Sequence, residues 1–449
     1  MYKFNNDMQC GFMPGKGTVD AIFMVRRLQE KFVEKKKKLY MCFVDLEKAF
    51  DRVPRRVIEW ALRMKFVEEN MVRVIMKMYE GAKTKVRVRN GLSEEFEVKV
   101  GVHQGSVLSP FLFNIVMDVV CGTVMEGLVF EILYADDLVL LAESMEELRK
   151  KLSNWRDAIE KKGMKVNISK TKCLVSGEGG VKEISKIDPC AVCSKRVKRN
   201  SILCSSCNLW VHKKCSGIKG SLVKQTGIFR CKTCVQGAVI EGPREEMGGG
   251  VERVDSFVYL GDCIDAAGGS RSAVIARVRA GWRKFRELSG ALCARDWPLK
   301  AKGRLYSACV RTVMTYGSET WALKKDDEAV LRRAERAMIR RICGVSLREK
   351  KRSEELGKMI GLVDDIVTIV VRSRLRWYGH VQRREESAGI RKVLDLDVSG
   401  RRPRGRPNLT WEELVERDMK EVGMHKEESL VRQKWRRGVD NIGKNRLPP

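Results

Sequence analysis

The sequence lacks any long apolar run. None of its hydrophobic stretches approaches the roughly 20 residues that are needed to cross a membrane. Its first ten residues, MYKFNNDMQC, contain no apolar core of the kind found in secretory signal peptides. These two absences argue against a membrane protein and against a secreted one. We therefore expect a soluble, intracellular protein that has no membrane partner.

Acidic residues are scarce relative to basic ones. The 449 residues include 88 Lys and Arg but only 58 Asp and Glu, so the formal net charge is +30 and the pI is near 9.7. The basic residues are spread along the chain, which favours a polyanionic partner, with nucleic acid ahead of a membrane surface. A hydrophobic content of 43% allows a real core and excludes a disordered tail, and the length allows two to four domains.

Cysteine is abundant, with 15 residues in a chain that has no secretion signal. Such cysteines are expected to be reduced, so ordered spacings indicate metal sites before disulfides. Eight potential ligands between residues 188 and 236 form four close pairs: Cys190 and Cys193, Cys204 and Cys207, His212 and Cys215, and Cys231 and Cys234. Each pair can supply half of a tetrahedral zinc site, so this segment is predicted to fold around two Zn²⁺ ions.

Two adjacent carboxylates, Asp136 and Asp137, interrupt the apolar run EILYADDLVLLAES. Burying them costs several kcal/mol unless a cation, water or protonation compensates the charge. Another apolar run of strand length, LYMCFVDL, ends near Asp45. Two strand ends can bring the three carboxylates to one edge of a sheet, where a pair of Mg²⁺ ions would compensate them. The alternative is that the ADD segment is an exposed hairpin turn.

Helical and strand patterns alternate around these carboxylates. A helix is predicted after Asp45, with a break near Pro54, and Ser109 is predicted to cap a second helix. Ser144 and Glu147 form a capping box for an amphipathic helix. The segment MKVNISKTKCLV then alternates like a strand. The order of these elements predicts an α+β fold.

Four motifs occur in the order FVDLEKAFD, HQGSVLSPFLF, YADD and GMKVNISKTK. Together they resemble the palm motifs of reverse transcriptases, specifically those of non-LTR (LINE-type) retrotransposons. The resemblance implies a right-hand polymerase with an antiparallel palm sheet, flanking helices and a helical thumb. It also implies an RNA-directed DNA polymerase that uses two Mg²⁺ ions, an RNA template, a DNA primer and dNTPs. We therefore expect the protein in the nucleus, acting on chromosomal DNA, and also in the cytoplasm.

The same resemblance assigns roles to individual residues. Asp45, Asp136 and Asp137 are implied to be the catalytic carboxylates that bind Mg²⁺. Phe50 is implied to be the aromatic gate that excludes a ribose 2′-hydroxyl, and its alternative role is plain core packing.

Further residues are expected to contact substrates. Gln104 and Gly105 would contact the template and the incoming nucleotide. Lys170 or Lys172 resembles the basic residue that protonates pyrophosphate, and the sequence does not choose between them. QCGFMPGKGTVDAIF resembles a fingers motif, and VDSFVYLGDCID resembles the primer grip. The turn of the implied primer grip contains Tyr259, Leu260 and Gly261.

The cysteine-rich segment resembles a PHD-type zinc finger. Its cross-braced pattern implies one zinc bound by Cys190, Cys193, His212 and Cys215, and another bound by Cys204, Cys207, Cys231 and Cys234. Trp210 matches a position that can wall a methyl-lysine cage, but the basic SKRVKRNSIL segment offers no second aromatic residue. A structural or nucleic-acid-contacting role is therefore favoured over histone-tail binding.

The C-terminal half contains two features typical of nucleic-acid binding. In the helix DDEAVLRRAERAMIRRICGV, the packed face is predicted to be Leu331, Ala334, Met338 and Ile342. The opposite face carries Arg332, Arg336 and Arg340, which are predicted to contact duplex phosphates. A solvated helix face is the alternative for these arginines. The segment PRGRP resembles an AT-hook that would bind A·T-rich DNA through Arg404 and Arg406, with a basic loop as its alternative.

The predicted domains follow from these motifs. They are residues 1–38 as partial fingers, 39–178 as the palm, 188–236 as the PHD-like insertion, 251–268 as the primer-grip hairpin, 270–348 as the helical thumb and 349–449 as a basic C-terminal region. Met1 falls inside the fingers motif, so we expect a truncated copy. The alternative to a polymerase is a catalytically inactive relic that acts only as a nucleic-acid-binding or chromatin-binding zinc-finger protein.

Overall fold

The computed structural model of the chain divides into two compact units, Met1–Gly177 with Met247–Pro449, and Glu178–Glu246. The structure describes residues 8–88, 91–125, 130–177, 192–193, 201–203, 210–218, 231–232, 250–400 and 409–442. No helix within these described ranges is both long enough and apolar enough to cross a membrane.

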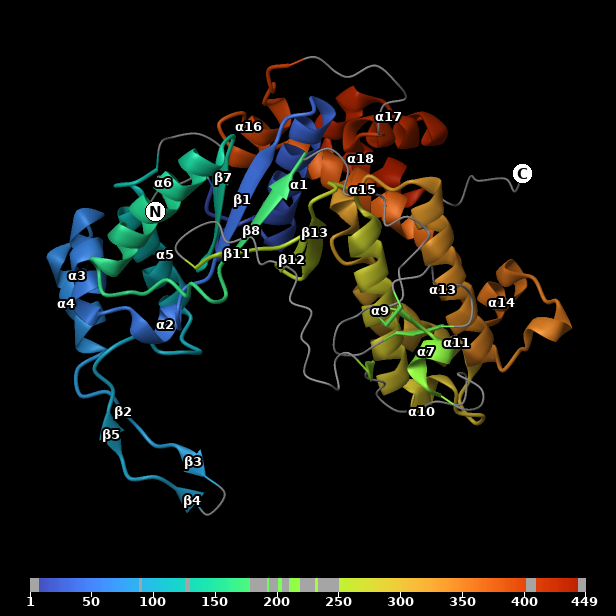
Figure 1. The fold of residues 1–449 in the computed structure, drawn as a ribbon, viewed down its shortest axis with the longest axis horizontal. Helices are drawn as coiled ribbons and strands as arrows, with labels where there is room; N and C mark the ends of the chain where they lie inside the picture. Colours follow the sequence, from blue (N-terminus) through green and yellow to red (C-terminus); the bar gives the residue numbers. More distant parts are fainter. Residues whose placement is uncertain are drawn as a thin grey trace. The chain divides into compact units, whose positions relative to one another are not determined.

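The first unit is built on a five-stranded sheet with the strand order β11-β8-β1-β7-β6 (Figure 1). Its strands are β1 (Leu39–Val44), β6 (Glu131–Tyr134), β7 (Asp137–Ala142), β8 (Lys172–Ser176) and β11 (Glu252–Arg253). Neighbouring strands are antiparallel except for β11 and β8. The strand β1 is central, and Val44 at its end pairs with Leu138 near the start of β7. The predicted antiparallel sheet with helices is therefore present, with one parallel edge strand.

Helices cover both faces of this sheet, which explains why its strands read as continuous apolar runs. Because successive residues of a strand face opposite sides, Cys42 joins one hydrophobic cluster and Phe43 joins the other. The helices of this part are α1 (Thr18–Glu34), α2 (Ala49–Arg52), α3 (Arg55–Met64), α4 (Glu69–Lys77), α5 (Leu108–Cys121) and α6 (Met145–Glu160). Side chains of α3, α5 and α6 join the cluster of Cys42, whereas α1 supplies the cluster of Phe43.

Local signals in the sequence were accurate for some boundaries. The predicted helix break is confirmed, because α2 ends at Arg52 and α3 begins after Pro54. The predicted cap of α6 is also confirmed, since the Ser144 hydroxyl oxygen accepts a hydrogen bond of 3.1 Å from the Glu147 amide.

One local prediction was wrong, and a second was only partly confirmed. Ser109 does not cap α5, which already begins at Leu108; the Ser109 hydroxyl donates to the His103 carbonyl, and the Ser106 hydroxyl oxygen accepts from the Leu108 amide. The strand predicted for MKVNISKTKCLV is limited to Lys172–Ser176. The Asn167 carbonyl accepts hydrogen bonds from the amide and hydroxyl of Thr171, and this turn interrupts the strand ladder.

Three short hairpin pairings complete the strands of the first unit. The strands are β2 (Lys83–Thr84), β3 (Arg87–Val88), β4 (Gly91–Leu92), β5 (Phe96–Glu97), β12 (Ser256–Tyr259) and β13 (Asp262–Asp265). β2 pairs with β5, β3 with β4, and β12 with β13, all of them antiparallel. The β12–β13 pair falls within the predicted primer grip.

A helical region follows the β12–β13 hairpin and has its own hydrophobic cluster. Its elements are α9 (Arg271–Glu287), α10 (Ser289–Leu292), α11 (Leu299–Leu305), the π-helix η2 (Tyr306–Arg311), α12 (Thr312–Thr315), η3 (Ser318–Thr320), α13 (Lys325–Cys343), η4 (Leu347–Glu349) and α14 (Ser353–Met359). The predicted packed face of α13 is confirmed, since Leu331, Ala334, Met338 and Ile342 are all buried. The amphipathic period of the sequence was therefore a reliable guide to this helix.

The last helices contribute to the core of the first unit. They are α15 (Ile366–Gln382), α16 (Gly389–Asp395), α17 (Trp411–Val422), η5 (Lys426–Leu430) and α18 (Arg432–Asp440). Trp411 packs edge-on against Phe23 of α1, with ring centroids 4.8 Å apart. Arg374 and Asp418 form a buried ion pair of 2.7 Å. These helices thus cover the side of α1 that is turned away from the sheet.

The described part of the second unit contains β9 (Ser201–Leu203), β10 (Trp210–His212) and α7 (Lys213–Ser216). The two strands form an antiparallel pair in which His212 lies opposite Ser201. His212 ends β10 and directly precedes α7.

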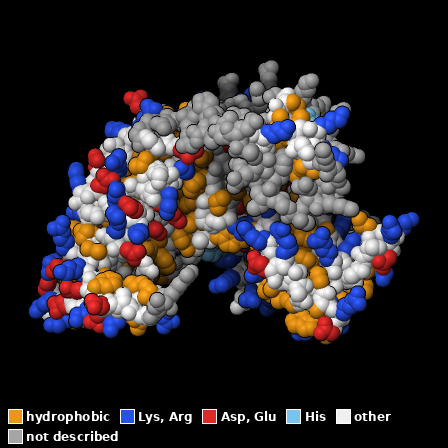
Figure 2. All heavy atoms as spheres, turned by 60° about the horizontal axis from the view of Figure 1, so that its bottom comes forward, with side chains coloured by type: hydrophobic (Ala, Val, Ile, Leu, Met, Phe, Trp, Pro, Cys, Tyr) orange, Lys and Arg blue, Asp and Glu red, His pale blue; other side chains and the backbone are white. Residues whose placement is uncertain are grey.

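Charged side chains are mixed over the visible surface. Figure 2 shows Lys and Arg side chains spread widely over that face, with Asp and Glu among them, instead of one continuous basic patch. The distribution agrees with the dispersed basic residues of the sequence.

Candidate active site and metal ligands

Three carboxylates meet where β1 ends and where β6 turns into β7. Asp45 directly follows β1, Asp136 lies in the two-residue turn after β6, and Asp137 begins β7. Because Val44 pairs with Leu138, continuing the register by one residue sets Asp45 opposite Asp137. The two side chains are therefore expected on the same face of the sheet.

The surroundings of these carboxylates make their ionisation unfavourable. Burial, together with the negative charges of Asp136 and Asp45, raises the pKa of Asp137 to about 6. Burial also raises the pKa of Asp136, and the charge of Asp45 adds to this effect. The buried Oδ2 of Asp45 accepts no hydrogen bond within the described residues. A divalent cation fits this donor set, because within the described ranges three clustered carboxylates face a single exposed ammonium, that of Lys170, and a cation would compensate the remaining negative charge.

The alternative reading of the ADD segment as an exposed turn is partly wrong. The segment does form a hairpin turn, but Ala135 is only 3% exposed and the two carboxylates are half-buried. Ala135 has a φ of +57°, in the left-handed region that costs free energy for a residue with a side chain. This turn therefore needs support from neighbouring groups.

That support comes from two residues to which the sequence patterns assigned no role. The Gln9 side-chain oxygen is buried and accepts hydrogen bonds from the amides of Gly11 (2.8 Å) and Ala135 (3.0 Å). A Cβ on Gly11 would lie 2.3 Å from the Ala135 nitrogen, so only glycine allows this close approach. The fingers-like motif QCG was the only signal in the sequence, and it does not reveal a partner more than 120 residues away.

The aromatic residue predicted as a gate lies in α2, close to these carboxylates in sequence. Phe50 is half-buried, and its ring stacks on that of Phe113 with centroids 4.6 Å apart. It also meets Phe12 edge-on at 6.3 Å. Core packing is thus present at Phe50, and the gate role stays a prediction.

The predicted template contacts lie in the loop before α5. The Gln104 side-chain amide donates a 2.6 Å hydrogen bond to Asp51, near the end of α2. Gly105 has a φ of +87°, and nothing lies within 4 Å of an added Cβ. The space beside Gly105 is therefore open, while its backbone conformation favours glycine.

The two candidate lysines differ in their contacts. The Lys172 ammonium donates to Glu252 at 2.8 Å and to the Ser169 carbonyl at 2.6 Å. The Lys170 ammonium lies 3.8 Å from Asp45 Oδ2, and its side chain is 68% exposed. Lys170 is therefore the better candidate for a proton donor beside the carboxylates, because its ammonium is accessible and close to them.

Strand β12, which leads into the predicted primer-grip turn, lines the same site. Leu260 and Gly261 form the turn between β12 and β13, with φ values of +45° and +83°. A pocket of about 350 Å³ is lined by Phe43, Val44, Asp45, Asp137, Leu138, Ser169, Lys170, Lys172, Phe257 and Tyr259. Tyr259 is 3% exposed, and its hydroxyl has no hydrogen-bond partner within the described residues. The hairpin and the carboxylates therefore share one pocket.

The three arginines predicted to contact phosphate have different surroundings on α13. Arg332 donates to Asp365 at 2.9 Å and to Glu328 at 3.2 Å, and Arg340 donates to the carbonyls of Ser346 and Lys351. Arg336 is exposed and has no protein acceptor within the ranges that the structure describes. Phosphate contact stays a prediction for all three, and Arg336 is the best placed of them.

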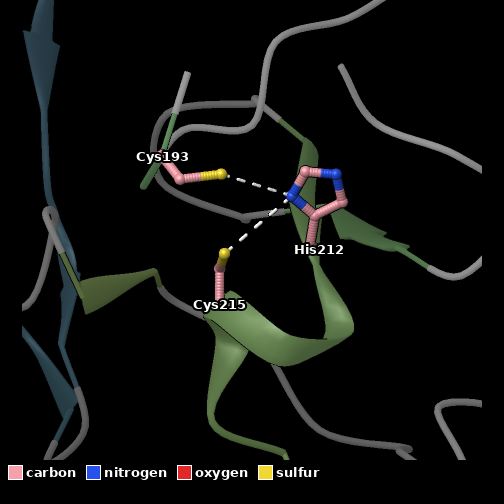
Figure 3. Close-up of side chains that lie close together, drawn as sticks. All are labelled: Cys193, His212 and Cys215. Carbon is pink, nitrogen blue, oxygen red and sulfur yellow. Dashed lines mark hydrogen bonds between the residues drawn. The ribbon is translucent and has the colours of Figure 1, made fainter. Parts of the chain in front are cut away.

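Three of the predicted zinc ligands converge in the second unit. Figure 3 shows the Cys193 and Cys215 sulfurs directed at Nδ1 of His212, at 3.4 and 3.9 Å respectively. All three ligand atoms lie within 4.8 Å of one another. Ligands bound to one tetrahedral zinc at 2.0–2.3 Å are about 3.5–3.8 Å apart, so the observed spacing fits a common metal ion.

The remaining zinc ligands are only partly described. Cys190, Cys204, Cys207 and Cys234 lie outside the described residues, as do the AT-hook residues Arg404 and Arg406 and the side chain of Trp210. Cys231 is described and buried, and it does not belong to the cluster of His212. Its separation from that cluster is compatible with the cross-braced assignment, which stays a prediction.

Replacing Asp137 by Asn should stabilise the protein at neutral pH when no Mg²⁺ is added. The pKa of Asp137 is about 6 in the folded chain and near 3.8 when unperturbed, so above pH 6 the ionised carboxylate disfavours folding. The melting temperature of the Asn variant should exceed that of the wild type by on the order of 2 °C at pH 8. The difference should shrink as the pH falls to 5, because protonation removes the charge from the wild type. Asp157→Asn on the exposed surface of α6 is the control, and a difference that is independent of pH would contradict the prediction.

The comparison with protein families gives a match over more than half of the chain. Residues 1–242 match the family described as reverse transcriptase (RNA-dependent DNA polymerase). The matched region includes the three carboxylates, the HQGS loop and the zinc-ligand segment up to Cys234.

Similar curated proteins come from retrotransposons. The retrovirus-related Pol polyprotein from the type-1 retrotransposable element R2 of Nasonia vitripennis is 32% identical over 188 residues, which is 40% of this chain and 18% of that protein. The RNA-directed DNA polymerase from the mobile element jockey of Drosophila funebris is 30% identical, over 36% of this chain and 18% of that protein. The probable RNA-directed DNA polymerase from transposon BS of Drosophila melanogaster is 23% identical over 71% of this chain and 30% of that protein. The chain thus spans less than a fifth of the length of the first two.

Among solved structures, telomerases share a weak likeness with this chain. The match with apo telomerase from Candida Tropicalis covers 86% of this chain and 57% of the telomerase chain, with 12% identity and a TM-score of 0.34. The match with telomerase from Candida albicans, in complex with a fragment of telomeric RNA, covers 85% of this chain and 53% of the telomerase chain, with 13% identity and a TM-score of 0.32. These scores are too low to support a conclusion about this chain.

Proposed function

The protein belongs to the reverse transcriptase (RNA-dependent DNA polymerase) family, and from this membership we propose that it extends a DNA primer along an RNA template as the polymerase of a non-LTR retrotransposon. The similarity to R2 and jockey proteins supports the non-LTR assignment. The observation that carries the proposal is the cluster of Asp45, Asp136 and Asp137 at the ends of adjacent strands, with a buried oxygen of Asp45 that accepts no hydrogen bond from the described residues.

Two Mg²⁺ ions would fit this cluster, with Asp45 and Asp136 as metal ligands and Asp137 as the third carboxylate. When bound, such ions lower the pKa of the primer 3′-hydroxyl and neutralise charge on the transferred phosphoryl group. The raised pKa of Asp137 and Asp136 supports this assignment, because clustered carboxylates that repel one another gain most from a cation.

The other residues around the pocket would bind and orient the substrates. The Lys170 ammonium, 3.8 Å from Asp45 and exposed, would donate a proton to the departing pyrophosphate. Phe50 lies on α2 and would restrict the sugar of the incoming nucleotide, and the open backbone at Gly105 would admit a nucleotide next to Gln104. The turn at Leu260 and Gly261 would hold the primer end at the far side of the pocket that Tyr259 lines.

Primer extension on a primed RNA template tests the proposal directly. The purified chain should incorporate dNTPs in a template-dependent order when Mg²⁺ is present, and sequencing of the product should return the complement of the RNA. A product that does not depend on the template, or no product with Mg²⁺ and dNTPs, would contradict the proposal.

The second unit is proposed to bind two Zn²⁺ ions in a cross-braced, PHD-like arrangement. The convergence of Cys193, Cys215 and His212 supports the first of the two sites. Each zinc would contribute directly to the stability of this small unit, since a module of this size has little hydrophobic core of its own. Its proposed role is structural or nucleic-acid-contacting, and histone-tail binding is not proposed.

The helical region 270–348 is proposed to follow the template–primer duplex like a polymerase thumb. Arg336 supports this role because its guanidinium is exposed and has no protein acceptor in the described part of the chain. Arg404 and Arg406 are proposed to add an AT-hook that binds A·T-rich DNA. We also propose that the protein acts on chromosomal DNA, which requires it to be in the nucleus.

Replacing Arg336 by Ala should weaken duplex binding and reduce its dependence on salt. One lost phosphate contact should lower the log–log salt slope by about one unit, equally for all sequences. Replacing Arg332, Arg336 and Arg340 together should lower it by up to about three units, with Arg332 and Arg340 contributing less because protein acceptors already hold them. Filter binding or fluorescence anisotropy at several salt concentrations measures the slope.

The control for this salt dependence is Arg156→Ala, on the exposed face of α6, where the arginine pairs with Glu160. It should leave the slope unchanged. An unchanged slope in the triple variant would show that the three arginines only face solvent.

A further inference from the structure

The hairpin formed by β12 and β13 depends on other parts of the chain for its position. An isolated two-stranded hairpin is marginally stable in water, yet this one supplies Phe257 and Tyr259 to the lining of the carboxylate pocket. It packs on β1 through Phe257, whose ring stacks on Phe43 with centroids 4.5 Å apart. Phe43 lies two residues before Asp45. A shift of the hairpin would therefore displace a ring that packs close to the carboxylates.

A single buried arginine of α1 makes two hydrogen bonds to this hairpin and one to the loop that follows it, in addition to those that Gln29, Ser272, Arg277 and Tyr316 make to the hairpin. The Arg26 guanidinium donates through Nε to Asp262 Oδ2 at 2.8 Å, through Nη2 to the Cys263 carbonyl at 2.9 Å and through Nη1 to the Gly269 carbonyl at 3.0 Å. Arg26 is 5% exposed and Asp262 is fully buried. The rigid, forked guanidinium therefore fixes both the direction and the distance of the hairpin relative to α1.

A second residue on the same face of α1 strengthens this connection. Gln29, one helical turn after Arg26, donates from its side-chain amide to the Asp265 carbonyl at 2.5 Å and to the Ser176 hydroxyl at 3.1 Å. Ser176 ends β8 of the palm sheet. Gln29 thus joins the end of β13 to the sheet itself.

The segment that leads into α1 also holds the catalytic turn. The Gln9 side-chain oxygen accepts from the Ala135 amide, next to Asp136. The carboxylate of Asp20, in the first turn of α1, accepts from the Gly17 amide at 2.8 Å and anchors the loop between Gln9 and the helix. One helix with its preceding loop is therefore bonded to both sides of the pocket, to the carboxylate turn at one end and to the hairpin in its middle.

From these contacts we infer that Arg26 is a positioning residue for the polymerase reaction, because it sets the distance between the β12–β13 hairpin and the three carboxylates. The inference rests on the proposed function and goes beyond it, since Arg26 contacts no substrate and acts through the hairpin. A displacement of about 1 Å between reacting groups can lower a rate by about 10²-fold. Loss of Arg26 should therefore affect the alignment of the primer end more than the affinity for dNTPs.

The test replaces Arg26 by Gln in the full chain. We expect kcat for primer extension to fall between about tenfold and a hundredfold, with the KM for dNTPs changed less than about threefold. The preference for a matched over a mismatched primer terminus should also fall, because a loosely held primer end no longer distinguishes them by geometry. Amide hydrogen exchange in residues 256–265 should accelerate about tenfold. Arg26→Lys keeps the charge opposite Asp262 but loses the fork, and its values should be intermediate.

Arg374→Gln is the matched control. Arg374 is 1% exposed and, like Arg26, donates to a buried aspartate (Asp418, 2.8 Å) and to a backbone carbonyl (Trp321, 3.0 Å), but it touches no part of the hairpin. This variant should lose thermal stability to a similar extent while keeping primer discrimination and the exchange rates of residues 256–265.

The outcomes separate the inference from the proposed function. If Arg26→Gln and Arg374→Gln lose primer discrimination to the same extent and show equal exchange rates in residues 256–265, the positioning role is overturned. The proposed polymerase function would still hold in that case if the wild type extends primers. Absence of extension by the wild type would overturn the polymerase and the positioning role together. Unchanged exchange in residues 256–265 of Arg26→Gln would overturn the positioning role whatever the activity.

Discussion

Replacing Asp136 by Asn, or Asp45 by Asn, should abolish primer extension by this chain. Both residues are proposed to hold the catalytic Mg²⁺ ions, and removing one carboxylate from such a site withdraws several kcal/mol of transition-state stabilisation, so the rate should fall by on the order of 10³-fold or more. Duplex binding should change little, because the residues proposed to contact phosphate, Arg332, Arg336 and Arg340, lie on α13. Single-turnover extension of a labelled primer on RNA measures the first effect, and anisotropy measures the second.

Asp157→Asn provides the control for these substitutions. Asp157 lies on the exposed surface of α6, and its change removes one negative charge without touching the carboxylate cluster. It should extend primers at the wild-type rate. Equal extension by wild type and Asp136→Asn would remove the basis for the metal-site assignment, and the catalytic role of Asp45 would then also need another explanation.

Purified protein that has never met a chelator should carry about two Zn²⁺ per chain. Replacing His212 by Ala should lower this content by about one, because His212, Cys193 and Cys215 are proposed to form one of the two sites. Complete removal of zinc should unfold residues 188–236, since a small module of this kind takes its folding free energy from the metal. Elemental analysis and limited proteolysis before and after chelation measure these effects.

The first unit should survive this treatment, because the clusters on both faces of its sheet are built from its own described side chains. Cys293→Ser, at an exposed cysteine between α10 and α11, is the control and should keep the full zinc content. Absence of zinc from unchelated protein would refute both sites. A content of one zinc that is unchanged in His212→Ala would refute the site of Cys193, His212 and Cys215.

Much of the local structure could be read from the sequence because its causes are local. Leu331, Ala334, Met338 and Ile342 are spaced three or four residues apart, so the sequence of this one segment is enough to predict that they lie on the buried face of a helix. The cap at Ser144 follows from two residues three positions apart. Where two local signals competed, the prediction failed, as at Ser109, where a hydroxyl that could have capped the helix donates to His103 instead.

The candidate site was also indicated by local patterns, although its geometry was not. A carboxylate at the end of one apolar run and a pair inside another predicted Asp45, Asp136 and Asp137 as one cluster, and the register of β1 with β7 sets them side by side. The choice between Lys170 and Lys172 needed coordinates, since only the position of Glu252 shows that Lys172 is already engaged. The same is true of α13, where the partners of Arg332 and Arg340 lie beyond the helix itself.

The sequence by itself determined the identity of the chemical groups: the carboxylates, the paired cysteines and histidine that are predicted to bind zinc, the excess of positive charge and the apolar runs that become strands. These depend on residue type and on spacing within a few positions, which a linear pattern displays completely. Only the tertiary structure decided which groups support them. Gln9 reaches Ala135, and Arg26 reaches Asp262, across more than 120 and 230 residues respectively. Folding buries polar groups, and a buried polar group needs a hydrogen-bond partner. That partner can come from a distant part of the chain, so no local periodicity in the sequence predicts it.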